Sequence, residues 1–344
     1  MWWPSWPPRP AGAEAVPRPG LAMALLGLLV AGLFAAALLT GPAGLGPAEA
    51  IRALLGEGGA GAVLVMREIR LPRALLGLMI GASLGLSGAV LQGLLRNPLA
   101  EPGLIGVSGA AALGAVLALY TGLSAAFPLA LPLMGLAGAF AAVAALLALA
   151  GPGSMLTLIL AGVAIGAVAS ALSALVLNLA PNPFAALEIV FWMLGSLSDR
   201  SMTHVALAGP FILAGWAMLG GLGRGLDALT LGEDAAASMG VRLGRLRLLA
   251  ICGTAAAIGA ATAVAGVIGF VGLVVPHLMR PLVGAMPSRL LPASALGGAA
   301  MLLAADLAVR LIAPGRDIKL GVVTALVGAP FFLWLVLATR RRLA

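Results

Sequence analysis

Residues 70–115 read RLPRALLGLMIGASLGLSGAVLQGLLRNPLAEPGLIGVSGAAALGA. Between Arg73 and Arg96 no side chain is charged. This uncharged run is about as long as the ~20 residues that a helix needs to cross a bilayer core of ~30 Å. Because backbone polar groups in lipid must be satisfied within the segment, the run predicts a transmembrane helix.

The rest of the chain has the same character. Of its 344 residues, 62% are hydrophobic and 9% are charged, whereas an ordinary soluble domain carries roughly 25% charged residues. The mean hydropathy is +1.12. We therefore predict an all-α polytopic membrane protein of about ten transmembrane helices, the second long and the eighth too short to cross alone. The predicted helices are 21–40, 61–95, 103–120, 128–150, 154–179, 203–221, 244–266, 272–283, 290–313 and 319–338.

The basic residues indicate how the chain is oriented. Residues 1–20 are rich in Pro and Trp and are predicted to be a disordered tail, with 21–344 forming the transmembrane domain. If the N-terminus is cytoplasmic, a majority of the 20 Lys and Arg residues lie in inner segments, so both termini are predicted to be cytoplasmic. The arginines between Arg67 and Arg73 depart from this rule. The net charge of +8 is scattered between apolar runs, which favours membrane loops and argues against nucleic acid.

A weak internal repeat is also present. GASLGLSGAV at 81–90 aligns with GAATAVAGVI at 259–268, and the two segments share Gly81/Gly259, Ala82/Ala260 and Gly88/Gly266. They lie five crossings apart and so run in opposite directions. This pattern is typical of an inverted repeat, which places a transport path near the repeat interface.

The sequence shows no arrangement of residues typical of catalysis or metal binding. His204 and His277 are far apart and neither has a ligand partner at helical spacing. No G-x-x-x-x-G-K-[ST] occurs, and the only lysine, Lys319, precedes Leu320. We expect no catalytic residue, metal or cofactor in this chain, and we assign any ATP hydrolysis, with its ATP and magnesium, to a partner.

Three segments together closely resemble the FecCD-like permease family of ABC importers for iron–siderophores, haem and cobalamin. They are the stretch at 70–115, GRGLDALTLGEDAAASMGVRLGRLR at 223–247, and AGVIGFVGLVVPHLMRPLVG at 265–284 with the LGVVTALVGAPFFLWLVL that follows. The resemblance covers the chain from about residue 60 onward. It implies the type II ABC importer permease fold in a bacterial inner membrane. The implied partners are a second copy, two cytoplasmic ATPase subunits, a periplasmic or lipid-anchored substrate-binding protein, a metal-chelate substrate and membrane lipid.

The resemblance also implies roles for two groups of residues. The segment 223–247 would couple the chain to the ATPase through Leu231, Gly232, Glu233, Ala236, Ser238, Met239 and Gly240, although an ordinary polar loop remains an alternative. Arg70, Arg73 and Arg310 would receive carboxylates of the binding protein, since a guanidinium pairs bidentately and stays charged. Snorkelling at a helix end is the alternative for Arg70 and Arg73. Pairing with Asp306, four residues earlier, is the alternative for Arg310.

A polar cluster lies between the second and third predicted helices. We assign Gln92, Asn97 and Pro98, together with Gly266 in the second repeat segment, to the transmembrane path or gate region. A simple capped turn at Asn97–Pro98 is the plainer interpretation. His277 is interpreted as a structural hydrogen-bonding residue in preference to a haem ligand.

The sequence therefore predicts a permease subunit of an ATP-driven importer for an iron–siderophore or similar metal chelate. Haem or cobalamin is the alternative substrate. An ion-coupled secondary transporter would need buried carboxylates along a path, for which only Asp306 and Glu188 are candidates. An intramembrane enzyme would need a nucleophile or a metal pair.

Overall fold

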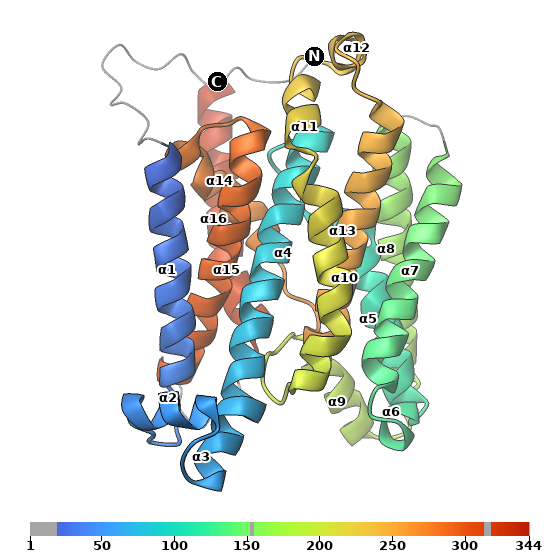
Figure 1. The fold of residues 1–344 in the computed structure, drawn as a ribbon. Coiled ribbons are helices and arrows are strands. Elements are labelled where there is room, and N and C mark those ends of the chain that lie inside the picture. Colours follow the sequence, from blue (N-terminus) through green and yellow to red (C-terminus); the bar gives the residue numbers. More distant parts are fainter. Residues whose placement is uncertain (1–18, 152–154, 313–317, 344) are drawn as a thin grey trace.

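The computed structural model describes residues 19–151, 155–312 and 318–343. Every regular element within these residues is a helix, which confirms the all-α prediction (Figure 1). The predicted tail, 1–20, lies outside the described residues except for Pro19 and Gly20, which already belong to the first helix.

Seven helices of the described residues are long and apolar enough to cross a membrane. They are α1 (Pro19–Leu39), a continuous helix (Ala60–Leu95), α7 (Ala130–Ala150), α8 (Met155–Asn178), α10 (Met202–Gly220), α13 (Leu243–Ala265) and α15 (Pro287–Ile312). The continuous helix consists of α3 (Ala60–Leu64), the π-helical turn η1 (Val65–Arg70) and α4 (Leu71–Leu95).

Shorter apolar helices complete the bundle. They are α5 (Val107–Tyr120), α9 (Pro183–Met193), α14 (Val271–Val283) and Leu320–Leu335 within α16 (Leu320–Leu343). The remaining short elements are α2 (Pro47–Leu55), η2 (Pro102–Ile105), α6 (Leu123–Ala126), α11 (Gly223–Leu229) and α12 (Glu233–Ser238). Each of the ten predicted helices corresponds to one of the longer elements, including the long second and the short eighth. The sequence analysis missed α2, α6 and α9.

The helices run side by side between two ends, which we call the α12 end and the α2 end (Figure 1). The first described helix begins and α16 finishes at the α12 end, while α2, α3, α6 and α9 lie at the α2 end. The helices α4 and α13 form the centre, with 83% of the most apolar window of each buried. They run in opposite directions, as the two repeat segments predict.

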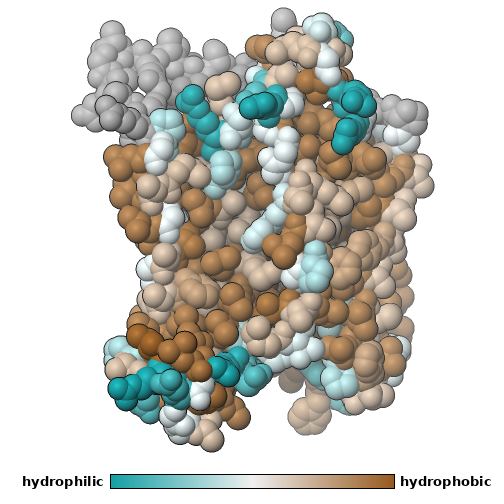
Figure 2. All heavy atoms as spheres, viewed as in Figure 1, coloured by the Kyte–Doolittle hydropathy of each residue, from teal (hydrophilic) through white to brown (hydrophobic). Residues whose placement is uncertain are grey.

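Surface hydropathy agrees with a membrane location. Figure 2 shows a broad hydrophobic band over the middle of the molecule, with hydrophilic side chains gathered at the two ends. At the α12 end the sequence places Arg224, Arg242, Arg245 and Arg289, all exposed. The chain is therefore a multi-pass membrane protein.

Candidate functional site

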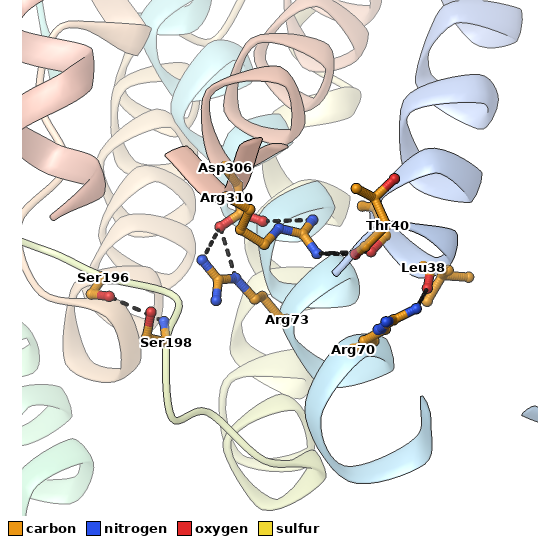
Figure 3. Close-up of polar contacts among 9 residues, drawn as sticks. Leu38, Thr40, Arg70, Arg73, Ser196, Ser198, Asp306 and Arg310 are labelled. Atoms are coloured by element: carbon orange, nitrogen blue, oxygen red, sulfur yellow. Dashed lines mark hydrogen bonds and ion pairs between the residues drawn. The ribbon is translucent and has the colours of Figure 1, made fainter. Parts of the chain in front are cut away.

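The predicted docking arginines converge at the α2 end, where two of them bind the last turn of α1 (Figure 3). The Nη1 atom of Arg70 donates to the carbonyls of Leu38 and Leu39 at 3.0 and 3.2 Å. The Nη1 atom of Arg310 donates to the carbonyls of Ala37 and Thr40, both at 3.0 Å. The last four carbonyls of a helix lack partners within it and carry partial negative charge, so the two guanidinium groups cap α1.

Asp306 joins this cluster together. Its Oδ1 atom accepts from Nε and Nη2 of Arg73, each at 2.8 Å, and its Oδ2 atom lies 3.0 Å from Nη2 of Arg310. The Asp306 side chain is only 3% exposed. A carboxylate so deeply buried is costly unless it is paired, and here two cations pair it. The cluster therefore ties α4 and α15 to each other and, through Arg310, to α1.

The arrangement bears on the docking prediction without testing it. Arg70 is 4% exposed in this chain, whereas the Arg73 side chain is 19% exposed. The local pair between Asp306 and Arg310 that the sequence left open is present. Of the three arginines, Arg73 therefore offers the most surface to a partner. The sequence analysis missed the capping of α1, because each capping arginine is at least 31 residues away in sequence from the carbonyl that it binds.

A second polar cluster joins α4 to α14. The carbonyl of Gly272 would normally accept a hydrogen bond from the backbone N–H of residue 276, but this residue is Pro276, which has no N–H. The side-chain amide of Gln92 compensates, since its Nε2 donates to the carbonyls of Gly272 and Leu273 at 3.4 and 3.3 Å. Its Oε1 accepts from Nη2 of Arg280 at 2.7 Å. Gln92 is buried and braces a proline-containing helix, and the sequence analysis did not identify Arg280 as its partner.

The remaining residues assigned to the path or gate divide into two places. Asn97 is exposed, and its Oδ1 accepts from the backbone N of Leu99 at 2.9 Å, so Asn97 and Pro98 form the capped turn that was the plainer interpretation. Gly266 ends α13 with φ +75°, and a Cβ there would collide with the carbonyl of Trp192. Among the described residues, no hydrogen bond or close contact joins Gly266 to the Asn97–Pro98 turn.

Glu101 connects the loop before α5 to the start of α14. Its Oε1 accepts from the backbone N of Phe270 at 2.7 Å, at the first turn of α14. Phe270 itself has φ +67°, an uncommon conformation for a bulky residue. This hydrogen bond therefore joins the loop before α5 to the break before α14.

The predicted coupling segment forms two short helices at the α12 end, and its last residues, 243–247, belong to α13. Leu231 and Met239 are 70% and 63% exposed, whereas Ala236 is buried. Glu233 pairs with Arg247 at 2.8 Å, which fixes α12 to α13. Gly232 has φ +111°, so it supplies a backbone conformation that other residues avoid. The other predicted coupling residues follow in and after α12, at Ser238 and Gly240.

A pocket of about 470 Å³ opens at the α2 end beside α9. Aromatic and charged side chains line it together, and the Nζ atom of Lys319 lies 5.6 Å from the centre of the Phe191 ring. Burial lowers the pKa of the Arg200 guanidinium from its ordinary value, and the neighbouring Asp199 carboxylate raises it. Among the described residues, no three His, Cys, Asp or Glu side chains gather in a way that could hold a metal ion.

Comparison with known proteins places this geometry in a family. The model of the FecCD transport family matches residues 28–338. The ferric enterobactin transport system permease protein FepD of Escherichia coli is 39% identical over 330 residues, covering 95% of this chain and 97% of FepD. The hemin transport system permease protein HmuU of Yersinia pestis is 39% identical over 280 residues, covering 80% and 84%.

A solved structure is similar over nearly the whole length. It is described as an inward-facing conformation of a metal-chelate type ABC transporter, and it matches with a TM-score of 0.82 at 33% identity. The match covers 93% of this chain and 99% of that chain. This chain therefore belongs to the FecCD transport family.

Proposed function

We propose that this chain is the membrane-spanning permease subunit of an ABC importer that carries a metal chelate, foremost an iron–siderophore complex, into the cytoplasm. The coupling segment carries the proposal. Leu231 and Met239 expose apolar side chains on a segment that also carries Glu233, Asp234 and Ser238, at one end of a transmembrane bundle. Exposed apolar side chains on a polar rim are typical of a site where another protein docks.

The docked protein, in this proposal, is an ATPase subunit that binds ATP and magnesium. The pair between Glu233 and Arg247 joins α12 to the beginning of α13. Since α13 is one of the two most buried helices, a displacement of α12 would reach the centre of the bundle. The permease would thus respond to ATP hydrolysis without carrying out any covalent chemistry. The α12 end would face the cytoplasm, with both termini inside.

The opposite end would receive a substrate-binding protein. Arg73 is the best placed of the three arginines to meet a carboxylate, because its side chain keeps 19% exposure while paired with Asp306. Arg70 and Arg310 would act indirectly by holding α1 in position, so that the mouth keeps its shape.

Two alternatives are weighed against this proposal. Haem or cobalamin is the alternative cargo, since related permeases are named for hemin, for vitamin B12 and for ferric enterobactin. An ion-coupled secondary transporter would need a carboxylate that changes charge along a path. Asp306 does not fit that task, because ion pairs with Arg73 and Arg310 already occupy both of its carboxylate oxygens.

The decisive experiment is reconstituted transport. The chain, its ATPase and its binding protein are placed in liposomes, and uptake of a labelled ferric siderophore is measured with ATP and with an ion gradient instead. We expect uptake that needs ATP and the binding protein. Uptake of haem or cobalamin only would overturn the choice of cargo, and uptake driven by an ion gradient without ATP would overturn the class.

A further inference from the structure

A groove of about 420 Å³ lies between α1, α4, α10 and α15. In Figure 1 the upper parts of α1 and α10 stand apart, with α4 and α15 between them. The walls are apolar except at Trp216, whose Nε1 donates to Oγ of Ser83 at 2.9 Å, and at Ser288. The volume falls within the ~300–1,000 Å³ typical of sites for small molecules.

The length of the groove matches one leaflet of a membrane. It follows α15 from Ser288, at the α12 end, to Ala299. At 1.5 Å per helical residue this is about 16 Å, roughly half of the ~30 Å hydrocarbon core. The groove therefore extends from one membrane surface to about the middle, which is the depth that a single acyl chain occupies.

The rim at the α12 end carries positive charge from two helices. Gly223 and Ser288 line the rim, and the residues that follow them are the exposed Arg224 and Arg289. The two elements touch there, since a Cβ on Gly223 would lie 2.9 Å from Cα of Ser288. The nearby acid, Asp227, uses its Oδ1 to accept the backbone N–H of Ser288 at 2.9 Å.

We propose that this groove binds one anionic phospholipid, with an acyl chain against Trp216 and the phosphate between Arg224 and Arg289. A guanidinium pairs well with phosphate, and cations at a membrane surface attract anionic lipids. The lipid would lie against the turn from α10 to α11, at the start of the coupling segment. The proposed function adds that this leaflet is the cytoplasmic one, and no other part of the proposal rests on it.

Quenching of Trp216 fluorescence tests the proposal. A chain with Trp216 as its sole tryptophan, the others replaced by Phe, is placed in phosphatidylcholine bilayers. Phosphatidylglycerol or phosphatidylcholine with brominated acyl chains is then added at equal mole fraction. We expect a preference for phosphatidylglycerol of roughly thirtyfold, the order that two surface cations give. Arg224→Gln with Arg289→Gln should reduce this preference to about one, whereas Arg245→Gln, which removes an exposed arginine of the same end, should keep it.

Three results would overturn the proposal. Equal quenching by both lipids in the parent chain would mean ordinary surrounding lipid, and no quenching by either would mean that protein fills the groove. A preference that survives the double substitution would place the phosphate elsewhere. As a check on folding, native mass spectrometry of the chain with all its tryptophans should show one retained phosphatidylglycerol, which the double variant loses and Arg245→Gln keeps.

Discussion

Asp306 illustrates how one residue can serve several helices. It is nearly inaccessible, yet it sits between the guanidinium groups of Arg73 and Arg310. Arg310 in turn binds two carbonyls of α1. An acid at this position removes the repulsion that the two arginines would otherwise feel, and it fixes their directions. The carboxylate thus orients an arginine that caps the end of α1.

Replacement of Asp306 by Asn should strongly destabilise the chain. Breaking a buried ion pair by removing one partner typically costs ~3–5 kcal/mol, because the remaining charges stay buried and unpaired. We expect the free energy of unfolding in detergent to fall by about this amount. Glu188→Gln is the control, since it removes an exposed carboxylate at the same end. Equal stability of the two variants would show that the cluster around Asp306 contributes little.

Glycines on α4 let its backbone approach neighbouring helices closely. Gly81 and Gly85 face α15, where an added Cβ would collide with the carbonyls of Gly298 and Ser294. Gly88 faces α14 in the same way. Small residues at this spacing let helices approach in a membrane, where apolar side chains gain little from leaving lipid. Gly77, Gly81 and Gly85 recur every four residues, so they lie on about the same side of α4.

Gly85→Ala should therefore be destabilising, while Gly93→Ala on the same helix should not. At Gly85 the new methyl group meets the carbonyl of Ser294, and overpacking of this kind costs ~1–3 kcal/mol. At Gly93 the nearest atom lies 3.6 Å away, and alanine favours the helix. Thermal unfolding of the two variants should separate them clearly. If both variants unfold at the same temperature, α4 and α15 have room for a methyl group at Gly85.

The position of α12 should depend on its ion pair with α13. Glu233→Arg would place two cations together, and we expect the proposed ATPase partner to show weaker substrate-stimulated ATP hydrolysis with this variant. Combining Glu233→Arg with Arg247→Glu restores a pair of opposite charges and should recover part of the activity. The pair is partly exposed, so its own strength is only ~0–1 kcal/mol. No recovery in the double variant would mean that Glu233 contacts the ATPase directly.

The sequence predicted the elements better than the contacts between them, for physical reasons. Long apolar runs are needed to cross lipid, so the long helices were recognisable. Both α2 and α9 were missed because they are short, although Pro47 and the Asn182–Pro183 pair are ordinary signals of a helix start. The bond from Glu101 to Phe270 joins residues 169 positions apart, and no local pattern encodes it.

At the scale of the whole molecule, the exposed helices are not equivalent. The described residues of α1 include no polar side chain, which suits a helix whose outer face contacts only lipid. On α8, by contrast, Ser170 and Asn178 are exposed beside small residues such as Ala167 and Ala171. Small residues and hydroxyl groups are typical of contacts between helices in membranes. We therefore infer that the proposed second copy packs against the α8 face, beside the pocket at α9.

Cross-linking between copies can test which face they share. The chain has a single cysteine, so Cys252→Ala provides a background without thiols. Ser170→Cys on α8 and Ala31→Cys on α1 are then compared, since both positions are exposed at mid-helix. A short bis-maleimide in proteoliposomes should link Ser170→Cys chains into dimers and leave Ala31→Cys chains as monomers, because only the α8 faces would lie within its reach. The reverse pattern would place α1 at the contact and leave α8 facing lipid, in which case the polar groups on α8 would need another explanation.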